Sequence, residues 1–541
     1  MEKDSGVDLT GLYQKYIEQI ETYLDYPAVR EPFENVIMAD ISEMTENPYR
    51  FGVVERGRSL ILSKEYKELA DGILLREAFA IFLPEAISSI PQAYDLCMYY
   101  AYLNISKEKK KRWMDIWIKI SPPIKILPNI YYNAPYSFPI FDELASKQFL
   151  REIMRILRKF DDYSIRMSQR EYLELIEEFM TRYTPKFSKS DILLLQELSQ
   201  KPNANLREIA LSLNISISAV SNILNKLKRW HILARRVSIG ISSFGLTYYF
   251  IYACFQEEKH KSELVEKLRK NPFTYQIYHI LDDDTPLLIF MIAPNSNAFV
   301  SKLDGFLNLI RKKYHVKELY YFIAEKYARF YNFSSFLIDE KRWNTNFHTW
   351  YLWTKRIIEQ EKSRIITFPF IKIRKIELPF NLTNLDMEII DYIITTNDLR
   401  VASLRKRFKK GTNVIVKKLK NYFKYGLLKH HVMLQNIGLN DIILFLTKAS
   451  EDDAELYKYL FDFLPFNMTF YVRGSFNACL SILKLPTGTA SDFLLYSRRI
   501  FKGSNVKIFL VDPSIGSYWR FPKDLWNPNT QSWRILDEIF K

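Results

Sequence analysis

Cysteine and histidine are scarce in this chain of 541 residues, which holds three Cys and seven His. Cys97, Cys254 and Cys479 stand far apart and form no CxxC pair, so the sequence predicts no disulfide framework. Free thiols are typical of a reducing compartment, and we expect a cytoplasmic protein. No group of His and Cys has the spacing of metal ligands, so we expect no structural zinc and no other metal.

Long apolar runs are also missing. Stretches such as LTYYFIYACF (246–255) are too short to cross a bilayer as a helix. The first ten residues, MEKDSGVDLT, contain no apolar segment of the kind that a secretory signal needs. We therefore expect neither a membrane segment nor a secretory signal.

The motifs of common enzymes are absent as well. The chain has no phosphate-binding loop, no GxGxxG and no GxSxG in a suitable context. The helical segment REAFA carries Arg76 and Ala80 where a zinc protease needs two histidines, so Glu77 is interpreted as a solvated or ion-paired carboxylate. Asp282–Asp284 are interpreted as a polar turn in preference to a cation site. We expect no enzyme, no catalytic residue and no cofactor.

What the chain does have is apolar residues and positive charge. Hydrophobic residues make up 48% and aromatic residues 15%, enough for a buried core in each of about three to five domains. The formal net charge is +15, which suits a polyanionic partner such as nucleic acid or an anionic membrane surface.

The second half of the chain repeats itself. Segment 206–239 aligns without a gap on 401–434, and apolar residues such as Val220 and Ile415 coincide. Further matching blocks follow in the same order: 244–253 with 437–446, 271–280 with 464–473, and 291–294 with 483–486. Because chance is a poor account of ordered blocks, we predict one unit at about 187–332 and another at about 382–522.

Each unit has two parts in the predicted secondary structure. Three helices, at 190–200, 206–213 and 217–230 in the first copy, precede a short strand pair at 232–239. A βαββαβ order follows, with its segments at 246–255, 259–270, 275–280, 286–292, 299–314 and 316–323. The predicted fold class is α+β: a mostly helical N-terminal domain, then two repeats of a winged helix-turn-helix plus a ferredoxin-like domain.

The predicted domain boundaries follow from this pattern. The mostly helical domain spans 1–186 and is interrupted by an irregular Pro- and Tyr-rich segment. The first winged helix spans 187–240 and the first ferredoxin-like domain 241–332, and a connector with a helix follows at 333–381. The second winged helix spans 382–434, the second ferredoxin-like domain 435–522, and a C-terminal tail 523–541.

The third helix of the first copy has a polar face suited to a DNA groove. Apolar residues such as Val220 and Leu224 point inward, which leaves small polar residues and asparagines outward, and Asn can pair with adenine through two hydrogen bonds. The candidate DNA-binding residues are Ser218, Ser221, Asn222, Asn225, Lys226 and Arg229 on the helix, and Arg235 and Arg236 in the wing.

The corresponding segment of the second copy is strongly basic. Between Arg400 and His431 there are eleven Lys or Arg residues and no acidic residue. Phosphate binding with release of counterions offsets the repulsion in so dense a cluster, so we expect this copy to hold the DNA backbone. Its candidate residues are Asn413, Lys417, Lys418, Lys420, Lys424 and Lys429.

The segment LREIALSLNISISAVSNILNKLKRWHIL (206–233), followed by βαββαβ, resembles archaeal and bacterial regulators of the leucine-responsive (Lrp/AsnC) type, and its helix-turn-helix also resembles that of MarR-type regulators. The resemblance covers both units, about half of the chain. It implies double-stranded DNA as partner, transcription control, and a small-molecule effector at the ferredoxin-like domains. This chain departs from the family by carrying two units and about 186 residues before them, so it is either a pseudo-dimeric monomer or a homodimer.

Two other functions fit the same pattern. Tandem winged helices also occur in replication initiators and in DNA-segregation proteins. Winged helices serve in protein–protein contacts too, so a non-enzymatic scaffold that contacts the transcription machinery is the alternative outside DNA binding.

Overall fold

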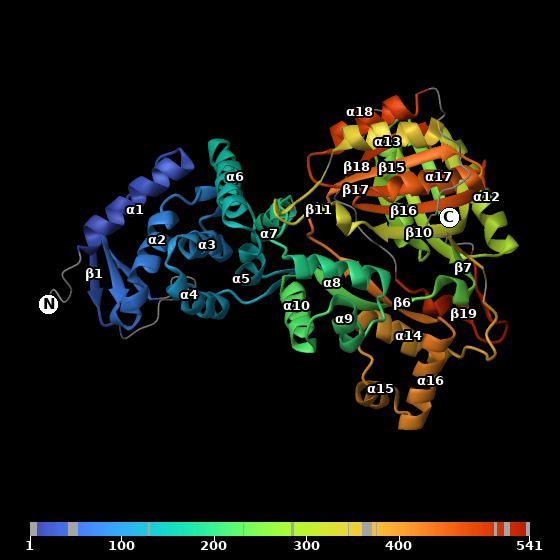
Figure 1. The fold of residues 1–541 in the computed structure, drawn as a ribbon, viewed down its shortest axis with the longest axis horizontal. Helices are drawn as coiled ribbons and strands as arrows, with labels where there is room; N and C mark the ends of the chain where they lie inside the picture. The colour runs from blue at the N-terminus through green and yellow to red at the C-terminus, as the bar shows by residue number, and fades with distance from the viewer. Residues whose placement is uncertain are drawn as a thin grey trace. The chain divides into compact units, whose positions relative to one another are not determined.

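The computed structural model describes residues 8–41, 52–127, 130–180, 182–230, 232–282, 286–344, 346–359, 370–374, 376–502, 506–512 and 520–536 (Figure 1). The chain forms two compact units. Unit 1 contains residues 1–186 with the short segments 225–232 and 435–438, and unit 2 contains 187–224, 233–434 and 439–541.

Unit 1 is mostly helical, as predicted. Helix α6 is its longest and buries Phe149, Ile153 and Leu157, which recur at the spacing of one helical face. The helices are α1 (Leu9–Leu24), α2 (Ala70–Ala80), α3 (Tyr94–Asn104), α4 (Lys107–Ile120), α5 (Ala134–Ser137), α6 (Glu143–Asp162) and α7 (Gln169–Met180).

Unit 1 also contains strands that the sequence did not indicate. Strands β1 (Asn35–Ala39), β2 (Val53–Arg56) and β3 (Ser59–Ser63) form a sheet in the order β1-β3-β2. Within the segment predicted as irregular, β4 (Ile124–Leu127) pairs antiparallel with β5 (Ile130–Tyr132).

Unit 2 contains two three-helix modules. The predicted helices of the first are confirmed to within about a residue, and its first helix is capped by Ser188 and Asp191, while Thr383 and Asp386 cap the first helix of the second in the same way. The first module is α8 (Lys189–Gln200), α9 (Leu206–Leu213) and α10 (Ile217–Arg229), whose last five residues are counted with unit 1. The second is α14 (Asn384–Thr396), α15 (Val401–Phe408) and α16 (Thr412–Lys424).

Each module is followed by a ferredoxin-like βαββαβ domain, which confirms the predicted fold class. The sheet orders are β10-β7-β9-β8 and β18-β15-β17-β16, so in both domains the first strand lies between the fourth and the third. The first domain comprises β7 (Leu246–Phe255), α11 (Glu258–Lys270), β8 (Thr274–His279), β9 (Leu287–Pro294), α12 (Asn297–Lys313) and β10 (Val316–Tyr331). The second comprises β15 (Asp441–Lys448), α17 (Glu451–Phe461), β16 (Phe466–Gly474), β17 (Ala478–Leu485), α18 (Ala490–Ile500) and β18 (Val506–Val511).

The strands of the two domains form one continuous sheet that encloses a shared core, and we call this sheet the sandwich. Strand β10 pairs with β16 from Phe322 to Tyr331, and Ile280, just after β8, bridges Val511, the last residue of β18. Phe250 and Phe470, one from each domain, pack together inside with their ring centroids 4.8 Å apart. Strand β10 is longer than the predicted 316–323 because its second part is paired by β16 and not by β7.

The backbone enters the two domains in the same way. Gly245 has φ of 64° and Gly438 has φ of 79°, so both adopt the left-handed conformation shortly before the first strand of their domain. These are the two glycines that the sequence alignment predicted to be equivalent.

Short hairpins follow the fourth strand of both domains and lie beyond the predicted ends at 332 and 522. They are η7 (Phe333–Ser335) with β11 (Phe336–Leu337) and β12 (Arg342–Trp343), and η8 (Lys523–Leu525) with β19 (Trp526–Asn527) and β20 (Ser532–Trp533). Each anchors the residue that precedes a three-helix module. The Phe336 ring lies 5.5 Å from the ring of Phe187, and Trp526 Nε1 donates to the carbonyl oxygen of Leu382 at 3.2 Å.

The connector contains the helix that was predicted for it. Helix α13 spans Phe347–Glu359, and its Trp350 Nε1 donates to the carbonyl oxygen of Leu460 at 3.0 Å. Strand β13 (Ile371–Lys372) then pairs with β10 in the sheet.

Candidate nucleic-acid interface

The predicted strand pair at 232–239 is wrong. This segment is a single strand, β6 (Leu233–Ile239), and its antiparallel partner is β14 (Leu428–Leu434) of the second half. The register joins Leu233 to Leu434 and Ile239 to Leu428. We call this pair the β6–β14 ribbon. Because each half supplies one strand, neither module has a complete wing of its own, and the ribbon joins the two modules.

The first module presents its third helix through a tight turn. Asn214 ends α9 in the left-handed conformation with φ of 52°, and the Ser216 hydroxyl accepts a hydrogen bond from the backbone of Ala219 at 3.1 Å at the start of α10. Val220, Leu224 and Leu227 are buried, as predicted. The opposite face is exposed, and we call it the first stripe: Ser218, Asn222, Asn225 and Arg229.

The second module has the same geometry with a different surface. Lys409 ends α15 with φ of 50°, and Ile415 and Tyr422 are the buried residues of α16. The exposed face, which we call the second stripe, consists of Asn413, Lys417, Lys420 and Lys424. Each residue of the second stripe is the aligned counterpart of one in the first, so the two stripes occupy equivalent faces of equivalent helices.

Most of the positive charge in the second module is free to meet an anion. Among the described residues, two of the eleven cations are paired, Arg400 with Asp398 and Lys418 with Asp386. The other nine are exposed and form no ion pair with any residue that the structure describes: Arg405, Lys406, Arg407, Lys409, Lys410, Lys417, Lys420, Lys424 and Lys429.

Lys418 differs from the rest of the predicted set. It is half-buried and pairs with Asp386, whose Oδ1 also accepts a hydrogen bond from the Tyr422 hydroxyl at 2.5 Å. Burial raises the pKa of Asp386, but the hydrogen bonds from Lys418, Thr383 and Tyr422 outweigh burial and hold this pKa below its usual value. The Lys418 charge therefore stabilises the packing of α16 on α14.

Four other predicted residues lie beside the first stripe and not in it. Ser221 is half-buried, and so is Lys226, whose Nζ lies 5.0 Å from the Trp230 ring centroid. Arg235 and Arg236 lie half-buried on β6, and Arg235 Nη2 donates to the carbonyl oxygen of Ala204 at 2.8 Å. The ribbon also carries exposed Lys429, on β14.

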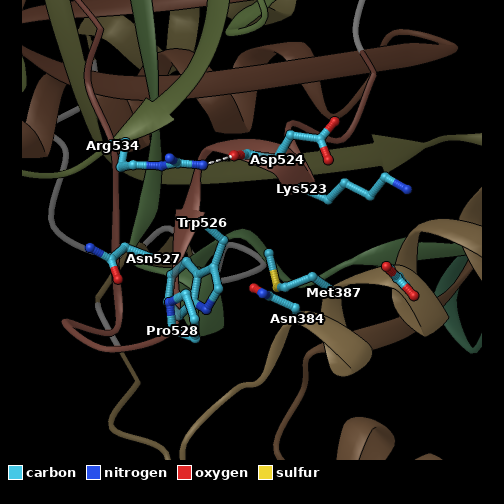
Figure 2. A pocket seen from close by; sticks show the side chains of 9 residues that line it. Asn384, Met387, Lys523, Asp524, Trp526, Asn527, Pro528 and Arg534 are labelled. Atoms are coloured by element: carbon cyan, nitrogen blue, oxygen red, sulfur yellow. Dashed lines mark hydrogen bonds between the residues drawn. The ribbon is translucent and has the colours of Figure 1, made fainter.

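The structure contains a cavity that the sequence did not indicate, because residues 523–541 were predicted to be a tail. Figure 2 shows it between α14 and the β19–β20 hairpin, where Arg534 donates to the carbonyl oxygen of Asp524. Its volume is about 490 Å³, and its lining residues are Asn384, Met387, Glu388, Lys523, Asp524, Trp526, Asn527, Pro528 and Arg534.

For Glu77 and for Asp282–Asp284 the sequence predicted neither a catalytic nor a metal-binding role. Glu77 is buried and ion-paired, and it accepts a hydrogen bond from Arg76 Nε at 2.7 Å. Asp283 and Asp284 lie outside the described residues. Within the described part of the chain, no three His, Cys, Asp or Glu side chains are grouped so that they could hold a metal ion, and no helix is long and apolar enough to cross a membrane.

Residues 187–229 match the family described as winged helix-turn-helix DNA-binding. No curated protein matches the sequence. Among solved structures, the chain is similar to the siroheme decarboxylase NirDL, at 11% identity over 65% of this chain and 96% of that one, with a TM-score of 0.38. It is also similar to AsnC from E. coli, at 16% identity over 25% of this chain and 91% of that one, with a TM-score of 0.21. A transcriptional regulator from Neisseria meningitidis, solved with L-Met, is similar at 18% identity over 25% of this chain and 88% of that one, with a TM-score of 0.21.

Proposed function

We propose that this protein is a DNA-binding transcription regulator that uses two winged helix-turn-helix modules in one chain. The observation that carries the proposal is the pair of exposed stripes on equivalent faces of α10 and α16, where a major-groove helix contacts base edges. The match of residues 187–229 to a DNA-binding family supports the same role for the first module.

In this proposal the two modules have different roles in DNA binding. Asn222 and Asn225 in the first stripe have the chemistry to read adenine, whereas Lys417 and Lys420 in the second have the chemistry to hold phosphates. The nine unpaired cations of the second module then supply affinity for DNA of any sequence, and this part of the affinity falls steeply with salt.

We further propose that the two halves arose by duplication and act as a pseudo-dimer. Left-handed residues recur at equivalent places: Asn214 and Lys409 end α9 and α15, and Lys341 and Gln531 directly precede β12 and β20. The β6–β14 ribbon and the pairing of β10 with β16 join the halves as two subunits of a dimer would be joined. A single chain then presents two DNA-reading helices, and the molecular mass in solution distinguishes this from a homodimer.

The remaining parts of the proposal concern partners and boundaries. The chain acts without catalysis and without a cofactor, and a small-molecule effector binds at the ferredoxin-like domains. The domain boundaries are those stated from the sequence, with the first and second β-hairpins, at 336–343 and 526–533, added to the ferredoxin-like domains that precede them.

Genome-wide occupancy of the full chain tests the function. Peaks at promoters support a regulator, and a single peak at a replication origin supports an initiator instead. An absence of peaks, together with no binding to duplex DNA in solution, overturns both and supports a scaffold that contacts the transcription machinery. A matched control is the chain with Lys417→Ala and Lys420→Ala, which should lose most of its occupancy.

A further inference from the structure

Two cations lie on the inner face of the sandwich. Ala478, Leu480 and Ile482 alternate along β17 and belong to the enclosed core, so Lys484 continues the same face. On β10, Tyr327 packs against that core and Arg329 follows two residues later. Both cations therefore stand at one end of the apolar interior, where Lys484 is half-buried and Arg329 reaches solvent.

These cations are part of a cluster that includes the ribbon. Arg329 Nη1 lies 3.2 Å from His431 Nε2, and its Nη2 donates to the Tyr331 hydroxyl at 2.9 Å. Lys484 and Arg329 both lie beside the ring of Phe466. The distance to its centroid is 5.9 Å from Lys484 Nζ and 5.6 Å from Arg329 Cζ. Arg236, on β6, is the cross-strand partner of His431.

No described carboxylate neutralises this cluster. Three other cations of the sheet are paired: Lys326 with Glu451, Lys507 with Glu318, and Arg473 with Glu325. By contrast, within the described ranges no ion pair involves any of the three cations of the cluster, which are Arg236, Arg329 and Lys484. Burial lowers the pKa of Lys484, and although Tyr331 acts to raise it, the charge of Arg329 lowers it further. Like charges held this close repel one another, and a bound anion would offset that repulsion.

Folding does not require a lysine at this position. The aligned residue in the first half is Ile292, which packs in an apolar cluster with Val237, Phe244 and Leu246. Strands β9 and β17 both run parallel to β10, so Ile292 and Lys484 stand at the same end of the sandwich, where the first domain presents an apolar side chain and the second presents a lysine. This difference between two aligned positions indicates a role for Lys484 in binding.

Aromatic rings surround the two cations. Tyr248 on β7 and Tyr327 on the adjoining strand β10 have ring centroids 5.7 Å apart, Tyr275 on β8 packs against the same core, and all three are half-buried. The ring of Tyr331 lies 4.6 Å from that of Phe466 at an angle of 51°. We propose that this cluster binds a small aromatic molecule that carries two or more carboxylates, with Arg329 and Lys484 holding the carboxylates and the tyrosines contacting the ring. The planar fork of an arginine matches a carboxylate, and tyrosines offer both an apolar face and a hydroxyl donor.

The site deepens the effector part of the proposed function, because it joins the sandwich to the ribbon. His431 and Arg236 belong to the two strands that link the helix-turn-helix modules. A ligand held by Arg329 and Lys484 on one side contacts these two residues on the other. A bound ligand therefore adds contacts between the sandwich and the ribbon.

The test is calorimetric titration of the full chain with benzene-1,3,5-tricarboxylate at low salt. Lys484→Ile, which copies the first half, and Arg329→Gln should each weaken binding by about tenfold or more, the effect of losing one charge-assisted hydrogen bond. Arg473→Gln removes an equal charge from the other end of β16 and should change the affinity by less than about twofold. Inorganic phosphate, which has no ring, should bind at least about tenfold more weakly than the tricarboxylate.

Several results would overturn the proposal. One is the absence of heat with the tricarboxylate, and another is equal affinity in Lys484→Ile, Arg473→Gln and the parent chain. Loss of duplex DNA binding in Lys484→Ile without any tricarboxylate binding would assign the cluster to DNA phosphates instead. Thermal melting of Lys484→Ile confirms that the variant folds. DNA binding by Lys420→Ala is measured separately, so failure of the ligand site and failure of the DNA-binding proposal are distinguishable.

Discussion

The side chain of Asn397 accepts a hydrogen bond from the backbone N–H of Val237 at 2.9 Å. Its amide nitrogen also donates to the carbonyl oxygen of Arg235 at 2.9 Å, so one asparagine satisfies two backbone groups of β6. Asn397 ends the first helix of the second module in the left-handed conformation, with φ of 57°. The second module is thus joined to a strand that belongs to the first half.

Asn397→Ala should loosen this junction. Two hydrogen bonds of about 1 kcal/mol each are lost, and alanine is strained by about 1 kcal/mol in the left-handed conformation. We expect a loss of about 2–3 kcal/mol and faster hydrogen exchange of the Val237 amide. Asn397→Gly is the matched control, since it keeps the conformation and should lose about 1 kcal/mol less. Unchanged exchange at Val237 in both variants would show that the junction does not depend on Asn397.

A buried carboxyl in unit 1 should make stability depend on pH. Asp95 is fully buried and accepts hydrogen bonds from Trp117 Nε1 at 2.7 Å, Tyr132 at 2.9 Å and Ser121 at 3.1 Å. Burial raises its pKa to about 7, although the three hydrogen bonds act in the opposite direction. Between about pH 4 and pH 7 the folded chain therefore holds a proton that the unfolded chain has released.

The stabilisation from this proton is complete at low pH and is lost as the pH rises through about 7. We expect the free energy of unfolding of unit 1 to fall between about pH 4 and pH 7, with a slope approaching about 1.4 kcal/mol per pH unit, and the melting temperature to fall with it. Asp95→Asn needs no proton and should flatten this dependence, whereas Asp115→Asn, an exposed carboxyl on α4, should leave it unchanged. Equal slopes in the parent chain and Asp95→Asn would contradict the assignment.

His431 on the ribbon should resist protonation. Burial lowers its pKa to about 4, and the positive charges of Arg329 and Arg236 act in the same direction. The neutral ring is favoured in the fold, so this contribution to stability is present above about pH 6.5 and is lost as the pH falls towards 4. The imidazole resonances in an NMR titration should have a midpoint near 4. Arg329→Gln should raise that midpoint, and an ordinary midpoint in the parent chain would be inconsistent with this environment.

Local features of the fold were predictable from the sequence. Helix α9 was predicted at its observed bounds, because its apolar spacing and the break at Asn214 and Ser216 lie within a few residues of one another. The first stripe followed from the same helical geometry. These features depend on side chains of one short segment, and a single sequence contains all of that information.

Features that depend on distant partners were not predictable. Strand β6 was taken for a strand pair because its partner β14 lies almost 200 residues away, and the length of β10 depends on β16 in the same manner. Lys418 was assigned to the DNA-binding set because its partner Asp386 lies on another helix. The cluster of Arg329 and Lys484 was missed since its members are brought together only by the sheet.

The two stripes should respond differently to mutation. A base contact discriminates between sequences by ~1–3 kcal/mol, whereas a phosphate contact adds affinity for every sequence. Asn222→Ala should therefore weaken binding to the cognate site more than binding to random DNA. Lys420→Ala should weaken both about equally and reduce the slope of log affinity against log salt by about one.

The measurement is a salt titration of both variants on cognate and random duplexes, with the cognate site taken from the occupancy peaks. Lys312→Ala, an exposed lysine on α12 outside both modules, is the control and should change neither affinity nor slope. If Lys420→Ala lost affinity on the cognate site alone, the second stripe would be reading bases and the division of work would be wrong. If neither stripe variant changed binding to any duplex, the modules would serve protein contacts, because an exposed lysine at a DNA interface cannot be removed without releasing fewer counterions.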